Sequence, residues 1–349
     1  MVTCLAFYLP QFHPTPENDE WWGAGFTEWT NVARGRPHFR GHHQPDLPGE
    51  LGFYDLRLNQ TRVQQASLAR QHGVDGFLYY HYWFSGRRLL HAPVDALLAS
   101  NSPDFPFALC WANENWTRTW DGGDSSVLAE QAYSPQDDLA HIRWLIQAFR
   151  DSRYFKVDGK PLFAVYRASL IPDPLWTTNL WRREVERAGL PGIHLVRVES
   201  AESEYPDPAT LGFDASIAFQ PRWRELPYAK GLERIRRGLG RGRRPNIVPY
   251  GEVVSTMTAR PRAPWLQYQC VSPGFDNSPR RKSAALILQG ATPELYARWV
   301  KETLEGQPNA QILFVNAWNE WAEGNHLEPN ARLGRAFLEA HRDAIAAWR

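Results

Sequence analysis

The stretch QTRVQQASLARQHGVDGFLYYHYWF (residues 60–84) carries the two patterns that decide the fold. Apolar residues recur at helical spacing over residues 60–72, and the pattern stops at Gly73, which indicates an amphipathic helix. An apolar run over residues 76–84 follows directly and is typical of a buried strand. The stretch therefore reads as one unit of a strand–helix alternation.

The same alternation recurs along the chain. Further helical patterns cover residues 137–150, 178–188, 293–304 and 333–348, and eight short apolar runs cover residues 5–9, 76–84, 105–112, 162–166, 193–198, 215–219, 266–271 and 312–317. Such alternation implies parallel strands joined by crossovers. We predict an α/β fold, a single (β/α)8 TIM barrel over residues 1–349 with long strand-end loops. A doubly wound open sheet is the alternative, but no glycine-rich phosphate fingerprint follows the first strand.

Composition excludes several classes of protein. The chain has 349 residues, 43% of them hydrophobic and 22% charged, which are values of a globular protein. The net charge of +1 gives no field to attract nucleic acid, and no apolar run is long enough for a membrane span. Three cysteines give neither a disulfide framework nor a metal-binding pair. The N-terminus lacks a secretory signal pattern, so we expect a cytoplasmic protein.

Two loops stand out. Residues 10–59 follow the first strand and are rich in Pro, Gly, His and Trp, and so long a loop is usually functional. In a barrel it would cover the face at the C-terminal ends of the strands. Residues 230–244 are strongly basic, which is explained either by a solvated loop or by a patch for an anionic glycan or lipid-linked substrate.

Polar and aromatic residues gather where the predicted strands end, which is where barrel enzymes carry their sites. Amides, carboxylates and His suit sugar hydroxyls, and rings suit apolar sugar faces, although the 16 Trp residues could also fill the core. We predict an oligosaccharide or polysaccharide substrate and neither metal nor other cofactor. The predicted substrate-binding residues are Tyr8, Gln11, Trp22, Glu28, Trp29, His81, Trp83, Trp111, Asn113, Glu114, Trp116, Arg118, Asp276, Asn319, Trp321 and His326.

Glu320 and Glu323 are the predicted catalytic residues. Glycosyl chemistry needs one protonated carboxyl as acid and one ionised carboxylate as base or nucleophile. Two close carboxyls can divide these roles because both are not easily charged together. If the last strand turns into a helix here, residues three apart face one cavity; in a continued strand they would face opposite sides. Otherwise one Glu caps a helix or pairs with an Arg, and Glu114 and Glu28 are further candidate acids.

Other catalytic arrangements are less well supported. No G-x-S-x-G nucleophile elbow occurs, and neither His42–His43 nor His81 has metal-ligand partners at a recognisable spacing. The segment DGGD at residues 121–124 could bind a metal in a nucleotide-sugar transferase, but its central glycines read better as a turn.

Several long motifs resemble one family. They are LAFYLPQFHP (5–14), ENDEWWG (17–23), FTEWTNV (26–32), CWANENWTR (110–118), WDGG (120–123) and NAWNEWAEG (316–324). Together they resemble the WbsX-like proteins over nearly the whole chain. That family is labelled glycosyltransferase-like and is found with bacterial surface-polysaccharide genes.

The last of these motifs is also similar to family 99 glycoside hydrolases, retaining α-mannosidases with a (β/α)8 barrel. Their motif reads NEWHEG, so Ala322 replaces a His in this chain. The resemblance implies that Glu320 deprotonates the sugar 2-hydroxyl to give an anhydro-sugar intermediate, and that Glu323 is the general acid/base. The Ala322 difference removes a ring from the motif.

Three functions remain as hypotheses. The first is a retaining glycoside hydrolase acting on a bacterial surface or exopolysaccharide with an α-mannoside- or α-rhamnoside-like linkage. The second is a glycosyltransferase in O-antigen or capsular polysaccharide biosynthesis, which the family label and the expected cytoplasmic location favour. The third, a glycan-binding module without activity, would not need two carboxylates at one strand end.

Overall fold

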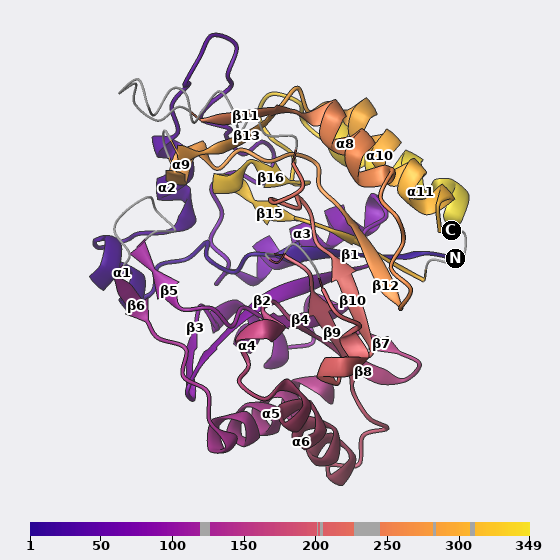
Figure 1. The fold of residues 1–349 in the computed structure, drawn as a ribbon. Coiled ribbons are helices and arrows are strands. Elements are labelled where there is room, and N and C mark those ends of the chain that lie inside the picture. Colours follow the sequence, from indigo (N-terminus) through magenta and orange to yellow (C-terminus); the bar gives the residue numbers. More distant parts are fainter. Residues whose placement is uncertain (119–125, 201, 203–204, 227–244, 282–283, 308–310) are drawn as a thin grey trace, which may run out of the picture.

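A computed structural model describes residues 1–118, 126–200, 202, 205–226, 245–281, 284–307 and 311–349. Eight parallel strands pair in the order β1–β14–β12–β10–β9–β8–β4–β2, and β2 pairs with β1 to close the barrel (Figure 1). The predicted (β/α)8 TIM barrel is confirmed, and every predicted apolar run overlaps one of its strands. The barrel strands are β1 (Thr3–Tyr8), β2 (Gly76–Phe84), β4 (Phe107–Trp111), β8 (Lys160–Val165), β9 (His194–Val198), β10 (Ala215–Ala218), β12 (Gln267–Val271) and β14 (Ile312–Val315).

Helices surround the barrel. Those that the periodicity predicted are α3 (Asn59–Gln71), α5 (Pro135–Phe149), α6 (Pro174–Arg187), α10 (Pro293–Glu305) and α11 (Ala336–Ile345), with a final 3-10 turn η6 (Ala346–Trp348). The pattern missed α4 (Ala92–Leu98) and α8 (Tyr250–Thr258), which have too few turns for a clear period. Helices α8, α10 and α11 lie together on one side, and α5 and α6 lie on the opposite side (Figure 1).

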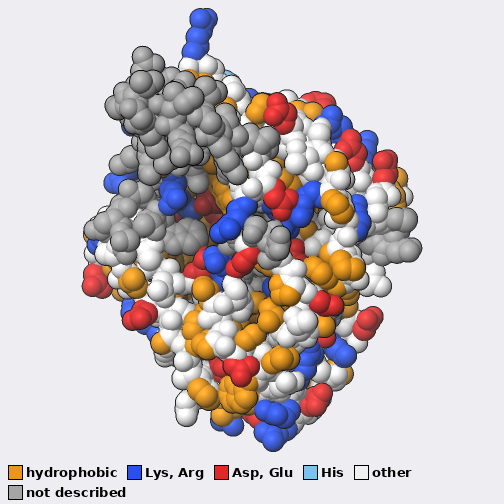
Figure 2. Space-filling model, viewed as in Figure 1, with side chains coloured by type: hydrophobic (Ala, Val, Ile, Leu, Met, Phe, Trp, Pro, Cys, Tyr) orange, Lys and Arg blue, Asp and Glu red, His pale blue; other side chains and the backbone are white. Residues whose placement is uncertain are grey.

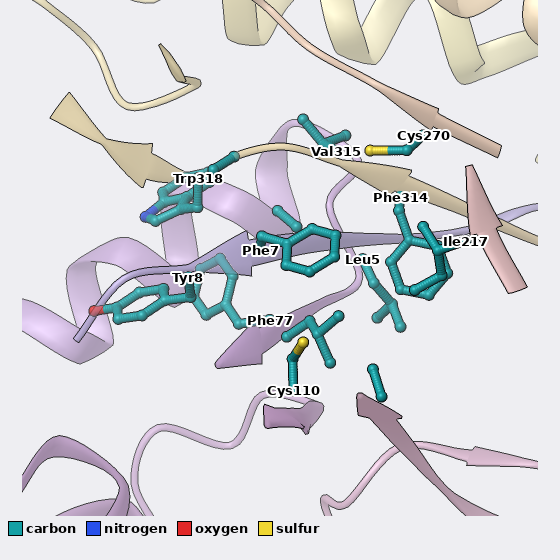
Figure 3. Close-up of a cluster of buried hydrophobic side chains, with 14 of the residues drawn as sticks. Leu5, Phe7, Tyr8, Phe77, Cys110, Ile217, Cys270, Phe314, Val315 and Trp318 are labelled. Carbon is teal, nitrogen blue, oxygen red and sulfur yellow. The ribbon is translucent and has the colours of Figure 1, made fainter. Parts of the chain in front are cut away.

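The barrel interior is aromatic. The ring of Phe7 on β1 lies 6.0 Å from that of Phe314, centroid to centroid (Figure 3). It also lies 5.6 Å from the ring of Tyr80 and 5.1 Å from that of Phe219. The next residue, Tyr8, faces the helices instead, and its hydroxyl donates to Gln65 Oε1 of α3 at 2.7 Å. Successive side chains of a strand point to opposite faces. A shift of one residue along the strand therefore moves a side chain from the barrel interior to the helix layer.

Short helices and strands lie outside the barrel, many of them in the loops that follow its strands. The loop after β1 forms α1 (Pro16–Trp22) and α2 (Glu28–Arg34), and the loop after β12 forms α9 (Ser278–Arg281). The last strand continues into β15 (Asn319–Glu320), the 3-10 turn η5 (Trp321–Glu323) and β16 (Asn325–His326). The remaining elements are β3 (Arg87–Leu89), β5 (Trp116–Thr117), β6 (Val127–Ala129), β7 (Lys156–Val157), β11 (Asn246–Pro249), β13 (Leu286–Gln289), η2 (Ala168–Leu170) and η3 (Pro208–Leu211).

The surface is mixed in charge. Basic and acidic side chains lie interspersed on the face shown in Figure 2, as the small net charge predicts. In the described part of the chain, no helix has the length and apolar character needed to cross a membrane. Both the basic segment 230–244 and the DGGD segment 121–124 lie outside the described residues.

Candidate active site

A cavity of about 360 Å³ opens at the C-terminal ends of the barrel strands. Seven predicted site residues line it: Gln11, Trp22, Glu28, Glu114, Trp116, Glu320 and Glu323. The predicted substrate-binding set did not include the rest of the lining, notably Asn31, Tyr80, Tyr82, Tyr166, Phe219, Trp223, Phe275, Asn277, Arg280 and Arg281. The structure therefore brings both predicted catalytic glutamates into one concave, aromatic-lined site, which is where a small-molecule or glycan site is expected.

A change of local structure lets both glutamates face this cavity. Glu320 ends the short strand β15, and the 3-10 turn that follows ends with Glu323. Gly324 then adopts a left-handed conformation with φ of +55°, where a side chain would meet the backbone of Asp276. Because the chain leaves the extended conformation after Glu320, residues three apart share one cavity, as the sequence analysis required.

Neighbouring side chains hold this segment in place. Asn319 Nδ2 donates to the Leu9 carbonyl at 3.0 Å, and its Oδ1 accepts from the Leu9 amide at 2.7 Å. The buried ring of Trp321 stacks on His326 with centroids 3.6 Å apart, and its Nε1 donates to Glu328 at 2.6 Å. Asn319 and Trp321 therefore position the glutamates from outside the cavity and do not line it.

Arg280 joins three carboxylates, and the sequence analysis missed it. Its Nε and Nη2 each lie 2.8 Å from Glu28 Oε1, its Nη1 donates to Glu323 Oε1 at 2.8 Å, and its Nη2 lies 3.6 Å from Glu320 Oε2. The guanidinium is almost fully buried. Its signal in the sequence was weak: an Arg in the SPRR segment, four residues beyond the predicted site residue Asp276.

The environments of the two glutamates differ. Burial, and next the charge of Glu323, raise the pKa of Glu320 to about 8, against the opposing effect of Arg280. Glu320 Oε2 is buried and accepts no hydrogen bond. Glu323 instead forms an ion pair with Arg280. Burial therefore favours the protonated form of Glu320 beside a Glu323 that pairs with Arg280, and acid/base catalysis by two carboxyls needs such a difference of environment.

A fourth carboxyl, Glu114, lines the cavity from the loop after β4. Burial raises its pKa, and Arg167 forms an ion pair with it. The side chain of its neighbour Asn113 is bonded to other protein groups: its Nδ2 donates to Tyr133 Oη at 3.0 Å and to the Arg167 carbonyl at 2.8 Å. Asn113 thus shapes the loop that carries Glu114 and lies outside the cavity lining.

Four predicted substrate-binding residues lie outside the cavity because their side chains point to the opposite face of their strands: Tyr8, His81, Trp83 and Trp111. His81 and Trp83 point into the helix layer, where His81 stacks on Trp144 of α5 and Trp83 Nε1 donates to Asp137 at 2.9 Å. Trp111 also packs there, and the residues of β2 that do reach the cavity are Tyr80 and Tyr82.

The other predicted residues lie beside the cavity. Trp29 is buried and donates to the Tyr54 carbonyl at 2.8 Å. Arg118 lies over the ring of Trp22, 5.2 Å from its centroid. Asp276 and His326 line a second cavity of about 390 Å³, where Asp276 pairs with His42 at 2.7 Å and His326 pairs with Asp46 at 3.0 Å.

Among the described tryptophans, more are buried in the interior than line the cavity. Five of them are almost completely buried, whereas three line the cavity. The interpretation of the clustered rings as sugar platforms is therefore restricted to Trp22, Trp116 and Trp223, and the buried five are Trp111, Trp181, Trp299, Trp318 and Trp321.

Comparison with known proteins shows the family to which this barrel belongs. The chain belongs to the family described as Glycosyltransferase WbsX, which matches residues 4–341. It is 44% identical over 349 residues to proteins named "Uncharacterized protein WxcX" from two strains of Xanthomonas campestris pv. campestris, and the match covers 99% of this chain. The chain spans about half, 50%, of the length of these curated relatives.

Solved structures share the fold. A GH99 endo-alpha-mannosidase from Bacteroides thetaiotaomicron, in complex with bis-tris-propane, superposes with a TM-score of 0.63 at 15% identity, covering 99% of this chain and 97% of the other. A protein described as glycoside hydrolase-like gives a TM-score of 0.62 at 13% identity, covering 98% and 93%. At these identities the likeness supports the barrel fold alone.

Proposed function

We propose that this protein is a retaining glycoside hydrolase that acts on a bacterial surface or exopolysaccharide with an α-mannoside- or α-rhamnoside-like linkage. The observation that supports this most strongly is the glutamate pair: Glu320 and Glu323 line one cavity, burial raises the pKa of Glu320, and Glu323 pairs with Arg280. Glycoside hydrolysis uses such a pair of carboxyls, one as acid and one as base or nucleophile.

The proposed reaction has two steps. First, Glu323 gives a proton to the glycosidic oxygen, the bond from that oxygen to the anomeric carbon breaks, and the sugar 2-oxygen bonds to this carbon while its proton passes to Glu320. Then Glu323 takes a proton from water, the water oxygen bonds to the anomeric carbon, and the 2-oxygen leaves and recovers its proton from Glu320. Two displacements retain the anomeric configuration. In an ordinary retaining scheme Glu320 would be the nucleophile.

Substrate binding must shift the proton between the two glutamates. In the free protein burial favours the proton on Glu320, whereas the reaction starts with it on Glu323. A sugar hydroxyl that donates to Glu320 favours the ionised form of Glu320, because hydrogen bonding to a charged form stabilises it. A coupled pair titrates as a unit, so the singly protonated pair is the active state in either arrangement.

Aromatic side chains supply the apolar surface that sugar rings need. Trp22 and Phe26 come from the loop after β1, and Trp116 follows β4. Trp223 and Phe275 come from the ends of β10 and β12, and their rings meet edge to face with centroids 4.5 Å apart. Rings from different strand ends therefore contribute to the cavity that holds the two glutamates.

The second candidate is a glycosyltransferase in the biosynthesis of O-antigen or capsular polysaccharide, which the family description favours. The two functions differ in what they consume. We expect the protein to release reducing ends from α-mannan or α-rhamnan oligosaccharides without any activated sugar, with retention visible by NMR of the first product. Turnover that occurs only with a nucleotide-linked or lipid-linked sugar donor would establish the transferase instead.

A further inference from the structure

The charge network around Arg280 has no assigned role. Arg280 lies on α9 after β12, Glu28 lies on α2 after β1, and Glu323 ends η5 after β14. Three loops that are far apart in the sequence therefore meet at one guanidinium. Glu28 and Arg280 are buried, with 1% and 8% of their side chains exposed, and Glu323 is partly buried at 20%, so water screens these charges little.

The contacts fix the orientation of the guanidinium. Glu28 Oε1 accepts from both Nε and Nη2 of Arg280, which holds one edge of the plane and leaves Nη1 for Glu323. An Arg held by two donors to one carboxylate has little freedom to turn. Glu28 is therefore better suited to anchoring Arg280 than to acting as a third acid, one of the roles that its sequence position had suggested.

The guanidinium lies closer to Glu323 than to Glu320. It contacts Glu323 at 2.8 Å and approaches Glu320 only to 3.6 Å, and Glu320 Oε2 has no hydrogen bond. Attraction between charges weakens with distance, so the positive charge favours the ionised form of Glu323 more than that of Glu320.

We propose that Arg280, anchored by Glu28, is a positioning residue that places the single proton of the glutamate pair on Glu320 in the free protein. This proposal rests on the proposed function for its kinetic part. Among the described residues, the groups that interact electrostatically with Glu320 come from four elements: Glu28 from α2, Tyr80 and Tyr82 from β2, Arg280 from α9 and Glu323 from η5. Arg280 is the cation of this set, and its neighbour Arg281 also lines the cavity.

The two members of the anchor affect the pair in opposite directions. The charge of Arg280 lowers the pKa of Glu320, whereas the charge of Glu28 raises it. Replacing Arg280 by a neutral residue therefore raises the pH at which the pair loses its proton, and replacing Glu28 by Gln lowers it. A residue that merely supported the fold would reduce activity without producing opposite shifts.

The test compares kcat/KM against pH for the wild type, Arg280→Gln and Glu28→Gln. We expect the wild-type value to fall above about pH 8, with this limb displaced upward by about one pH unit in Arg280→Gln and downward by about one unit in Glu28→Gln. Arg335→Gln is the matched control, since it breaks an exposed Arg–Glu pair with Glu50 and should leave the limb in place. The proposal would be overturned if the basic limbs of Arg280→Gln and Glu28→Gln stayed at the wild-type pH or moved in the same direction.

Two further measurements keep the test decisive. Because Arg280→Gln removes the buried cation that pairs with Glu28, Arg280→Lys and the double variant Glu28→Gln/Arg280→Gln accompany it. Arg280→Lys keeps the positive charge but loses the paired guanidinium donors. The basic limb of its kcat/KM profile should therefore stay closer to that of the wild type. Titration of the Glu320 carboxyl by ¹³C NMR, assigned with Glu320→Gln, needs no substrate. If the wild type cleaves no glycan, the proposed function fails, yet the opposite NMR shifts still decide the role of Arg280.

Discussion

Glu320 and Glu328 lie eight residues apart on the same C-terminal segment, and both are buried carboxyls whose pKa is raised by burial. Glu328 is completely enclosed by donors: its Oε2 accepts from Tyr54 Oη at 2.7 Å and from Trp321 Nε1 at 2.6 Å, and its Oε1 accepts from Gln65 Nε2 at 2.6 Å. Glu320 instead faces the cavity, has an oxygen without a hydrogen bond and lies beside a second carboxylate.

The difference shows that burial alone does not mark a reactive carboxyl. Every hydrogen bond that Glu328 accepts comes from the protein itself, so it has a fixed partner set and stabilises the fold. Glu320 lacks such partners, and an unpaired buried acceptor in a native structure has a cost that function explains better than stability does. Four predictions test whether this distinction holds.

The largest difference should appear in turnover. We expect Glu320→Gln and Glu323→Gln each to lower kcat by about 10²–10⁴-fold, because each removes a group that moves a proton in the proposed reaction. Glu328→Gln should reduce turnover far less in protein that remains folded, because Glu328 does not line the cavity. Release of reducing ends measures all three, and circular dichroism checks folding. Full activity in Glu323→Gln would remove that residue from the mechanism.

The free energy of unfolding should instead depend strongly on Glu328. Glu328→Ala leaves three buried donors without an acceptor, and each unpaired group costs about 1–3 kcal/mol, so we expect a loss of about 3–5 kcal/mol in the free energy of unfolding. Glu50→Ala, which breaks an exposed pair with Arg335, should change it by less than about 1 kcal/mol. Urea denaturation measures both, and equal small losses would show that the network around Glu328 contributes nothing.

The sequence predicted the barrel because its signal is repeated and local. Each strand is an apolar run, and five of the helices have a clear period. The phase of β2 was not predictable in the same way. Barrel strands are buried on both faces, so no polar alternation distinguishes the interior from the helix layer. His81 and Trp83 were therefore predicted to bind substrate, whereas Tyr80 and Tyr82 line the cavity.

The site was predictable where its chemistry is local and unpredictable where it is tertiary. Glu320 and Glu323 are three residues apart, so their spacing and their resemblance to a known motif were visible in the sequence. Arg280 lies 252 residues from Glu28 and 43 from Glu323, and only the closed barrel brings the three side chains together. No pattern along the chain encodes such a contact.

The pH dependence of stability gives a third, smaller effect. Glu320 has a pKa of about 8 in the folded protein against an ordinary value of 4.5, so between these pH values the folded state keeps a proton that the unfolded state releases. The unfolded state thus binds fewer protons, and wild-type stability falls as pH rises through this window. Glu320→Gln lacks this penalty.

We therefore expect Glu320→Gln to gain stability over the wild type progressively from about pH 5 to pH 8, reaching roughly 2–4 kcal/mol, since one pKa unit corresponds to about 1.4 kcal/mol. Urea denaturation at a series of pH values measures the difference. The same series for Asp137→Asn, a carboxyl that lies in the helix layer beside Trp83, provides a comparison outside the cavity. A difference between Glu320→Gln and wild type that is constant with pH would show that Glu320 is already ionised near neutral pH.

The smallest expected effect extends the comparison from carboxyls to aromatic rings. Trp22 lines the cavity, whereas Trp83 packs on His141 with its Nε1 bonded to Asp137. Stacking on a ring is worth about 1 kcal/mol, so Trp22→Ala should raise KM by about 5-fold while kcat changes little. Trp83→Phe keeps a ring in the helix layer and should leave KM unchanged, with a modest loss in Tm from the missing hydrogen bond. KM therefore distinguishes the two variants. A rise in KM for Trp83→Phe equal to that for Trp22→Ala would mean that the sugar reaches the helix side of β2.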